Sequence, residues 1–514
     1  MILFNFNIKA ELININNYVI DVDENFKINN IQQYQDDSYQ VLQAYILIKG
    51  DYLYEDNLNL ALKHKEQVIE IKDNKVISKN IYQNDRLIKL ITYEKNISFD
   101  IDNLNKIKYY DKEYMLINGY VSQVIQYHKN STKTAYLYLL HDKTSLNNNT
   151  LKHIKYKFTY DDNEHVIKKD DYNNNMVLLK HFDYYPKTTY FDRNNRIKNE
   201  YVFDKGYVIK HYVFYDKNRI IKNYYNFYAQ TKLDSNLKKR IKFVYTNNAK
   251  GNLINSKMMQ DKSQYVLRNY TYQPNTVLFK NNNTKLNTVT YYTYKNNKKI
   301  YLGYKKFNKG LVIDYNVRLN NVPYHNQFSG GYSSGCEMFS LWMGLEYKGV
   351  RTNAKYLYNH MPKSNSKPYY NKKSKRWIWD NPNEKFLGNP KGIMRNNANW
   401  GINPEGLKGL ANKFRKSYPK NNFSIGLMRD ALLDGNPVVV WTTFQFQKPA
   451  GYFKYYDKKG VRRYSYANFH VVLVTGMDKN NIYVTDPIFG KLKVAKNKFE
   501  RSYAPYGRKA LVIT

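Results

Sequence analysis

The chain has 514 residues, of which 42% are hydrophobic and 16% aromatic, so it is too apolar for a wholly disordered protein and long enough for two or three domains. Its 82 Lys and Arg residues outnumber 43 Asp and Glu residues, which gives a net charge of +39. Such a charge attracts polyanions, but it also follows from the Lys- and Asn-rich composition that an AT-rich genome encodes. No compact basic motif accompanies it, which disfavours nucleic acid as the partner and leaves anionic cell-wall polymer as a candidate.

Cys336 is the only cysteine, which excludes an intramolecular disulfide framework and a thiolate zinc site. We expect neither a metal nor a cofactor. The N-terminus lacks a basic patch followed by an apolar run, and no apolar run is long enough to span a bilayer. These absences predict a cytoplasmic protein without a transmembrane segment, with secretion or surface display by a non-standard route as the alternative.

The first part of the chain has the alternating pattern of β-strands. Apolar and polar residues alternate in Phe4–Ile8, Val68–Ile71 and Leu87–Ile91, and Asn- and Asp-rich turns such as Asp73–Lys75 separate such runs. Helical patterning is weak, and Tyr39–Leu47 is the best short helix candidate. We therefore expect a β-rich region over residues 1–130.

A repeat follows within a tyrosine-rich region that we place at residues 131–316. Phe191-Asp-Arg-Asn, Phe203-Asp-Lys-Gly and Tyr215-Asp-Lys-Asn recur every 12 residues, an interval that fits one strand and one tight turn. The pattern predicts an antiparallel meander of β-hairpins that serves binding or oligomerisation, with a plain spacer as the alternative. This meander resembles wall-protein repeats and the β-sheet add-on domains of bacterial adhesin and wall-teichoic-acid glycosyltransferases.

The composition changes near residue 317, because all five tryptophans and most prolines lie beyond about residue 320. Within this last region, residues 317–514, Cys336 follows a Ser-Ser-Gly turn and precedes a segment whose apolar residues fit one face of a helix that Gly349 ends. A helix N-terminus favours a thiolate, so we expect a lowered thiol pKa. Glu337 falls in the first turn, where easing the helix dipole is its expected role.

Three further segments predict a sheet after this helix. Leu432–Thr443 has the pattern of a helix end, a turn and a buried strand. Asn468–Asp478 is a predicted strand that opens on His470, and Asn480–Gly490 is its predicted hairpin partner, ending near Asp486. If the two strands pair, His470 and Asp486 meet near one edge of the sheet.

These residues supply the groups that a thiol nucleophile requires. Cys336 needs a base, for which His470 is the candidate, and the base needs an orienting group, for which Asp486 is the candidate. Gln327, together with the Cys336 backbone N–H, is the candidate oxyanion donor. Each has a plainer alternative: a packed thiol, a strand-end histidine and a turn aspartate.

Two rival residues and one insertion remain open. His325 is closer to Cys336 in sequence than His470, but it lies beside Gln327 on an extended segment and is expected to point to the other face. Asp478 is the competing acid and has the sequence context of a turn residue. The basic, aromatic insertion Lys363–Lys385 covers a substrate groove in one interpretation and is an exposed loop in the other.

The last region resembles the bacterial peptidase C39-like cysteine proteases, which have the papain-like fold. The matching pieces, in the family's order, are Val322-Pro-Tyr-His-Asn-Gln327, Gly335-Cys-Glu337, Phe386-Leu-Gly-Asn-Pro390, Trp400-Gly-Ile-Asn-Pro404, Gly435-Asn-Pro-Val-Val-Val-Trp441, His470-Val-Val-Leu-Val-Thr-Gly476 and Asp486-Pro487. The resemblance implies Cys336 as nucleophile, His470 as base, Asp486 as orienting acid and Gln327 as oxyanion donor. The membrane segment and ATPase of bacteriocin-exporting members, and the signal peptide of secreted relatives, have no counterpart here.

The sequence thus predicts a multi-domain protein, in which an N-terminal all-β meander precedes an α+β papain-like cysteine peptidase. We expect it to hydrolyse a peptide or isopeptide bond through a thioacyl intermediate, on a peptide or protein substrate, with acyl transfer to an amine also open. The alternative is a non-catalytic protein that binds wall polymer and carries an inert papain-like domain. Oligomerisation through the β region is compatible with both.

Overall fold

The structure is a computed structural model that describes residues 11–15, 18–22, 28–35, 40–47, 65–72, 75–84, 86–93, 110–277, 286–364, 366–393 and 399–514. The chain divides into two compact units: Met1–Lys242 with Ala249–Gly251, and Phe243–Asn248 with Asn252–Thr514. The strand predicted at Phe4–Ile8 lies outside the described residues, and so does most of the turn predicted at Asp73–Lys75. The domain limits near residues 130 and 317 stay predictions.

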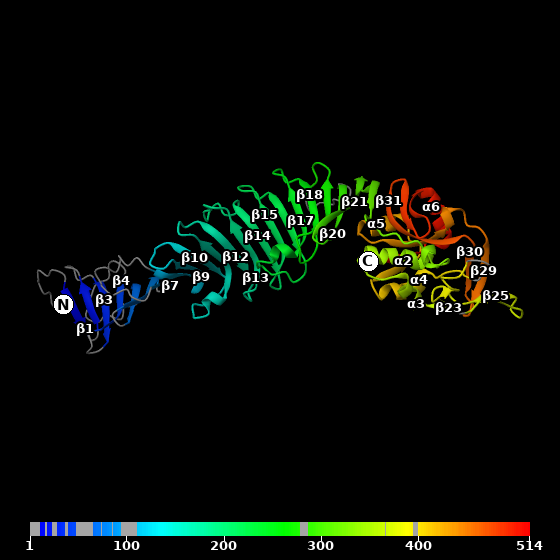
Figure 1. Cartoon of the computed structure of the whole chain (residues 1–514). Helices are drawn as coiled ribbons and strands as arrows, with labels where there is room; N and C mark the ends of the chain where they lie inside the picture. The colour runs from blue at the N-terminus through cyan, green and yellow to red at the C-terminus, as the bar shows by residue number, and fades with distance from the viewer. Residues whose placement is uncertain are drawn as a thin grey trace. The chain divides into compact units, whose positions relative to one another are not determined.

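The first unit is an antiparallel meander in which each strand from β1 to β16 pairs with the next one along the chain (Figure 1). Its strands are β1 (Glu11–Ile15), β2 (Tyr18–Val22), β3 (Ile28–Gln35), β4 (Gln40–Leu47), β5 (Lys65–Lys72), β6 (Lys75–Gln83), β7 (Arg86–Tyr93), β8 (Tyr110–Ile117), β9 (Tyr120–Tyr127), β10 (Thr134–Leu140), β11 (Ile154–Tyr160), β12 (Val166–Tyr172), β13 (Leu178–Tyr184), β14 (Ile197–Asp204), β15 (Tyr207–Phe214) and β16 (Ile221–Phe227).

The predicted strands at Val68–Ile71 and Leu87–Ile91 are confirmed, since they lie in β5 and β7. The helix candidate Tyr39–Leu47 is wrong, because Gln40–Leu47 forms strand β4. Backbone pairing explains the difference. β4 pairs with β3 on one side and β5 on the other, whereas an isolated helix of this length would be marginal in water.

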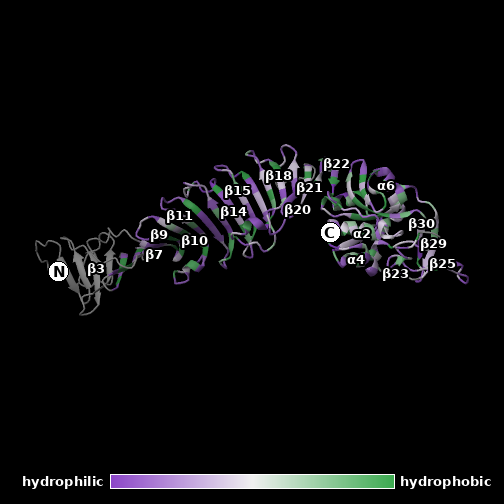
Figure 2. Cartoon of the chain, viewed as in Figure 1, coloured by the Kyte–Doolittle hydropathy of each residue, from purple (hydrophilic) through white to green (hydrophobic). Residues whose placement is uncertain are grey.

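The 12-residue repeat corresponds to the hairpins of this meander. Lys205 and Gly206 join β14 to β15 with φ of 48° and 80°, the left-handed conformations that a tight two-residue hairpin turn requires. Aromatic rings stack across the strands: the His211 ring lies 4.0 Å from that of Tyr201 and 5.0 Å from that of Tyr225. Hydrophobic and hydrophilic residues mix along these strands (Figure 2), as in a sheet with two partly solvated faces.

The second unit combines a further meander with a mixed helix and sheet region. Its strands are β17 (Ile241–Asn247), β18 (Leu253–Met259), β19 (Val266–Tyr272), β20 (Leu286–Lys295), β21 (Lys298–Asn308), β22 (Leu311–Arg318), β23 (Lys363–Ser364), β24 (Tyr369–Asn371), β25 (Arg376–Trp379), β26 (Phe386–Leu387), β27 (Ser417–Lys420), β28 (Val438–Thr443), β29 (Tyr452–Asp457), β30 (Arg462–Tyr466), β31 (Phe469–Asp478), β32 (Asn481–Asp486), β33 (Gly490–Ala495) and β34 (Ala510–Ile513). Its α-helices are α2 (Cys336–Tyr347), α3 (Ala354–His360), α4 (Pro404–Asn412), α5 (Ile425–Leu433) and α6 (Lys496–Tyr503).

A central antiparallel sheet with the order β27-β34-β28-β31-β32-β33 organises this region. Helix α2 packs against β31 and β28, and it lies among the other helices in Figure 1. The predicted strands with His470 and Asp486 are therefore confirmed as the neighbours β31 and β32. A separate small sheet, β24-β25-β29-β30, includes two strands from the insertion Lys363–Lys385.

The meander of the second unit continues into the central sheet. Strand β22 pairs with the end of β31, where Val317 opposes Met477. Val289, Tyr291 and Leu302 of the meander belong to the same hydrophobic core as α2 and β31. The meander strands β20 to β22 are therefore part of the structure that supports the central sheet.

Candidate active site

Helix α2 begins at Cys336, as the sequence predicts, and Gly335 is its N-cap residue. The expectation of a helix with a single apolar face is wrong, because nearly every residue from Cys336 to Leu345 is buried. The reason is that sheet strands and the helices α3 and α4 pack around α2 on several sides. Ser340 Oγ donates a hydrogen bond of 3.1 Å to the Val471 carbonyl, which fixes α2 against β31 one residue from His470.

The Cys336 thiol is 4% exposed and donates a hydrogen bond of 3.2 Å to Glu337 Oε2. Burial raises the pKa of this thiol well above its ordinary value. The charge and hydrogen bond of Glu337 raise it further, and the backbone N–H of Val471 opposes them. The direction of this pKa shift is opposite to the one expected from the helix N-terminus, because the thiol is buried beside a carboxylate.

His470 and Asp486 form a buried pair. His470 Nε2 lies 3.0 Å from both carboxylate oxygens of Asp486, and both residues have little exposure. Antiparallel pairing of β31 with β32 brings the two residues together, although they are 16 positions apart. Because this contact uses Nε2, the imidazole keeps Nδ1 for a second partner.

Asp486 is held by more than the histidine. Its Oδ1 accepts hydrogen bonds from the backbone N–H groups of Ile488 and Phe489, at 2.8 and 3.2 Å. Burial alone would raise the pKa of Asp486, but the bonds and charge of His470 and these two amides lower it below its usual value. The carboxylate therefore stays charged beside the imidazole.

Gln327 lies next to the same elements. Its backbone N–H donates to the Pro487 carbonyl at 2.9 Å, and its side-chain Nε2 donates to the Ser333 carbonyl at 3.0 Å. The residue is buried, and its Oε1 has no hydrogen-bond partner among the residues that the structure describes. The amide is therefore anchored between the segment after Asp486 and the turn before Cys336.

The two rival residues lie elsewhere. His325 Nε2 is 2.6 Å from Glu346 Oε2, and its ring stacks on Trp342 with centroids 3.6 Å apart. Asp478 ends β31, where it accepts hydrogen bonds from Asn481 and Tyr483 and pairs with Arg318. His325 thus has a carboxylate partner of its own, and Asp478 stabilises a turn.

Sequence reasoning assigned Glu337 only a helix-dipole role and missed its place in the site. The side chain is fully buried, with Oε2 on the Cys336 thiol and Oε1 accepting from the Ile402 N–H at 2.9 Å. Gly401 leaves room for it, since a Cβ there would lie 1.9 Å from Glu337 Oε1. Burial raises the pKa of Glu337 to about 7. The available signal was a carboxylate directly after the only thiol, within an apolar helix.

Replacing Glu337 with glutamine should make Cys336 more reactive. Gln keeps an acceptor for Ile402 but removes the negative charge beside the thiol, so the thiol pKa should fall. We expect iodoacetamide to alkylate Cys336 on the order of tenfold faster at neutral pH. The rate is measured against pH by mass spectrometry, with Glu346→Gln on the exposed side of the same helix as the control. An unchanged rate profile would show that the Glu337 charge does not act on the thiol.

Comparisons with known proteins place the region that holds these residues in a sequence family. Residues 319–511 match the model of the Peptidase_C39 like family. A solved C39-like peptidase from Bacillus anthracis is 28% identical, with 39% of this chain and 97% of that chain covered and a TM-score of 0.34. A mutant of S. aureus TarM is 12% identical over 32% of this chain and 23% of that chain, with a TM-score of 0.12. No curated protein sequence matches the chain.

Among the described residues, no helix has the length and hydrophobicity of a membrane span. The resemblance of the N-terminal meander to glycosyltransferase add-on domains stays a prediction. The family match covers the region that holds Cys336, His470, Asp486 and Gln327, and it names the family that the sequence motifs indicate. Residues 319–511 of this chain, which hold the candidate site, therefore match the Peptidase_C39 like family.

Proposed function

We propose that the C-terminal region is a papain-like cysteine peptidase that uses Cys336, His470, Asp486 and Gln327. The observation that carries the proposal is the buried contact between His470 and Asp486, on the strand against which the Cys336 helix packs. Nucleophilic catalysis by cysteine requires an imidazole that a third group orients, and here that imidazole lies on the strand against which the helix of the lone thiol packs. The family match supports a peptide as the substrate.

In the proposed reaction, His470 Nδ1 takes the proton of the Cys336 thiol while Asp486 stabilises the imidazolium that forms. The thiolate then attacks the carbonyl carbon of the scissile bond, so that a C–S bond forms and the carbonyl electrons move to the oxygen. Gln327 Nε2 and the Cys336 backbone N–H stabilise this oxyanion. Because the thiol pKa is raised, the attack depends on His470.

The oxyanion collapses and the C–N bond breaks, while His470 returns its proton to the leaving amine. A thioester on Cys336 remains. His470 then removes a proton from water, and the resulting hydroxide attacks the thioester to release the acid and the thiol. An amine in place of water would give acyl transfer with the same residues.

Replacing Cys336 with alanine should abolish peptide cleavage by the full-length chain. The expected loss is at least ~10³-fold in kcat/KM, since no other thiol exists to form the thioester. Cleavage is measured by mass spectrometry on a proteome-derived peptide library, with circular dichroism to check that the variant folds. Hydrolysis retained by Cys336→Ala would contradict the proposal.

A second candidate is a non-catalytic protein that binds anionic wall polymer through its basic surface. The observation that favours it is the buried thiol, which donates to Glu337 and has a raised pKa. If this candidate is correct, Cys336 should react with iodoacetamide no faster than a buried, non-catalytic cysteine of another protein. The chain should also sediment with cell walls, and added salt should weaken this association. Peptide cleavage that depends on Cys336 would reject this candidate.

A further inference from the structure

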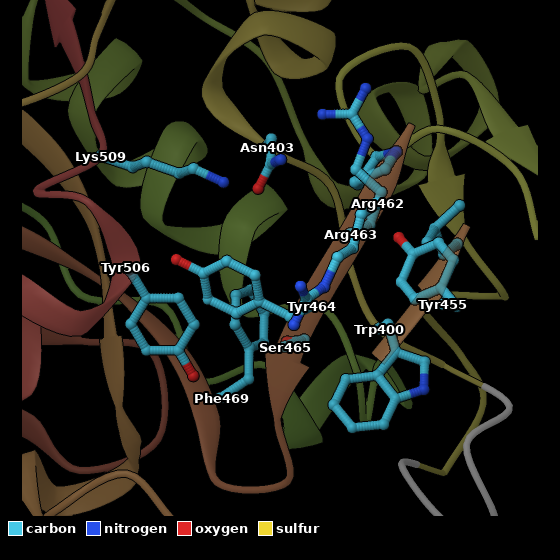
Figure 3. A pocket seen from close by; sticks show the side chains of 12 residues that line it. Trp400, Asn403, Tyr455, Arg462, Arg463, Tyr464, Ser465, Phe469, Tyr506 and Lys509 are labelled. Carbon is cyan, nitrogen blue, oxygen red and sulfur yellow. The ribbon is translucent and has the colours of Figure 1, made fainter. Parts of the chain in front are cut away.

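Basic and aromatic residues line a cavity of the second unit (Figure 3). It has a volume of about 120 Å³, which is enough for several waters or for a small polar group. Phe469, the residue before His470, lines it, and so does Tyr506, whose ring packs against Phe469 with centroids 5.7 Å apart. Gly401, next to the lining residue Trp400, adjoins Glu337. The cavity wall therefore includes the sequence neighbours of His470 and of Gly401.

Three cationic residues line this cavity: Arg462, Arg463 and Lys509. In Figure 3, Lys509 extends toward Asn403 from one side, and the two arginines of β30 lie on the other side. Arg463 has a carboxylate partner, because its Nε and Nη2 donate to Asp457 Oδ2 at 3.0 and 2.8 Å. Among the described residues, neither Arg462 nor Lys509 forms an ion pair. Asp457 thus neutralises one of the three cationic side chains that line the cavity, and the other two have no ion-pair partner among the described residues.

Lys509 is destabilised as a cation in this environment. Burial lowers its pKa, and the charge of Glu405 opposes that shift while Arg463 adds to it. Asn421 donates a hydrogen bond to Glu405 Oε1, whereas Glu405 Oε2 is buried without a hydrogen-bond partner among the described residues and forms no ion pair with Lys509. An anion that enters the cavity would offset the burial of Lys509.

Two neutral donors add to the charges. Trp400 Nε1 and Tyr506 Oη belong to lining residues that are each 6% exposed, and neither atom has a hydrogen-bond partner among the described residues. Buried donors without a partner cost free energy unless a ligand or water satisfies them. Carboxylates bind to cations and to N–H and O–H donors, and the residues that line this cavity carry both kinds of group.

We propose that this cavity binds a carboxylate of the peptide substrate, from either an Asp or Glu side chain or the C-terminus. The inference rests on the proposed function, because it assigns a substrate preference to the same site. The carboxylate accepts hydrogen bonds from Lys509 and Arg462, and its charge offsets the burial of Lys509. The peptidase then selects acidic peptides or peptide ends, close to the Cys336 thiol.

The test measures binding without turnover, on the full-length Cys336→Ala chain. Fluorescence anisotropy compares three random peptide pools that differ in one feature: a central Glu with both ends blocked, a central Gln with both ends blocked, and a central Gln with a free C-terminal carboxylate. We expect one carboxylate pool to bind about tenfold more tightly than the blocked Gln pool at physiological ionic strength. The tighter pool identifies the source of the carboxylate.

The preference should disappear in Arg462→Gln and Lys509→Met, which remove the two unpaired cations. Arg501→Gln, an exposed arginine of α6 outside the cavity, should keep it and controls for general attraction to a chain with a net charge of +39. Equal binding of the three pools, or an equal loss in Arg501→Gln, would overturn the inference. Failure of the proposed function would be recognised by a different result: peptide hydrolysis would be absent, or it would persist without Cys336. The ratios of peptide binding could still be measured in that case.

Discussion

Replacing His470 with alanine is expected to lower kcat/KM for peptide cleavage by ~10³-fold or more, because a thiol with a raised pKa cannot ionise at neutral pH without a base. The loss should lie in kcat rather than KM, since the imidazole acts on the reacting atoms and not on the ground-state peptide. Single-turnover kinetics on one cleaved peptide measure the chemical step directly. Circular dichroism verifies that β31 still folds.

His325→Ala is the matched control for this prediction. It removes an imidazole that pairs with Glu346 and stacks on Trp342, so it should leave kcat/KM within about threefold of the wild type. Asp486→Asn should fall between the two, because it keeps the bond to His470 but removes the charge that stabilises the imidazolium. If His325→Ala were as damaging as His470→Ala, the assignment of the base would be wrong.

The elements around the site could be predicted from sequence because each has a strong local pattern. The helix after Cys336 and the strands with His470 and Asp486 are continuous apolar segments bounded by Gly, Asn or Pro, and they match a known motif order. The short turn between the two strands also predicts that they pair with each other in antiparallel orientation. Whether the four residues act as assigned is a question of chemistry that the pattern alone does not answer.

The environment of the thiol could not be predicted in this way. Glu337 is buried because Ile402, 65 residues away in sequence, supplies an N–H to its carboxylate. The cavity depends on residues between Pro382 and Lys509, which only the tertiary structure brings together. Local propensity also failed at Gln40–Leu47, where pairing with β3 and β5 overrides a helical pattern.

A chain that begins at Val317, the predicted domain boundary, is expected to be much less stable than one that begins at Phe243. The shorter chain lacks strands β17 to β21 and most of β22, and with them the ion pairs that Arg268 and Lys305 make with Asp434 and Asp430 of the α5 segment. It also exposes core residues that Val289, Tyr291 and Leu302 cover. Thermal unfolding followed by circular dichroism should show a cooperative transition for the longer chain and aggregation or a broad, low transition for the shorter one. Equal melting temperatures would show that the last meander is dispensable.

A point substitution tests the same contact without truncation. Leu302 is 2% exposed, and its Cδ1 lies 3.6 Å from the position that a Cβ on Gly435 would take, so β21 packs directly on the turn between α5 and β28. Leu302→Ala should cost about 2–5 kcal/mol and lower the melting temperature of the chain that begins at Phe243 by about 10 °C. Leu311→Ala, at an exposed position of β22, should change this melting temperature little.

Because β22 pairs with the strand that carries His470, the Leu302 variant should also lose peptide cleavage at a lower temperature than the Leu311 variant. Parallel losses of structure and activity would indicate that the meander strands β17 to β22 support the catalytic sheet, whereas activity that survives melting of the meander would assign them a separate role.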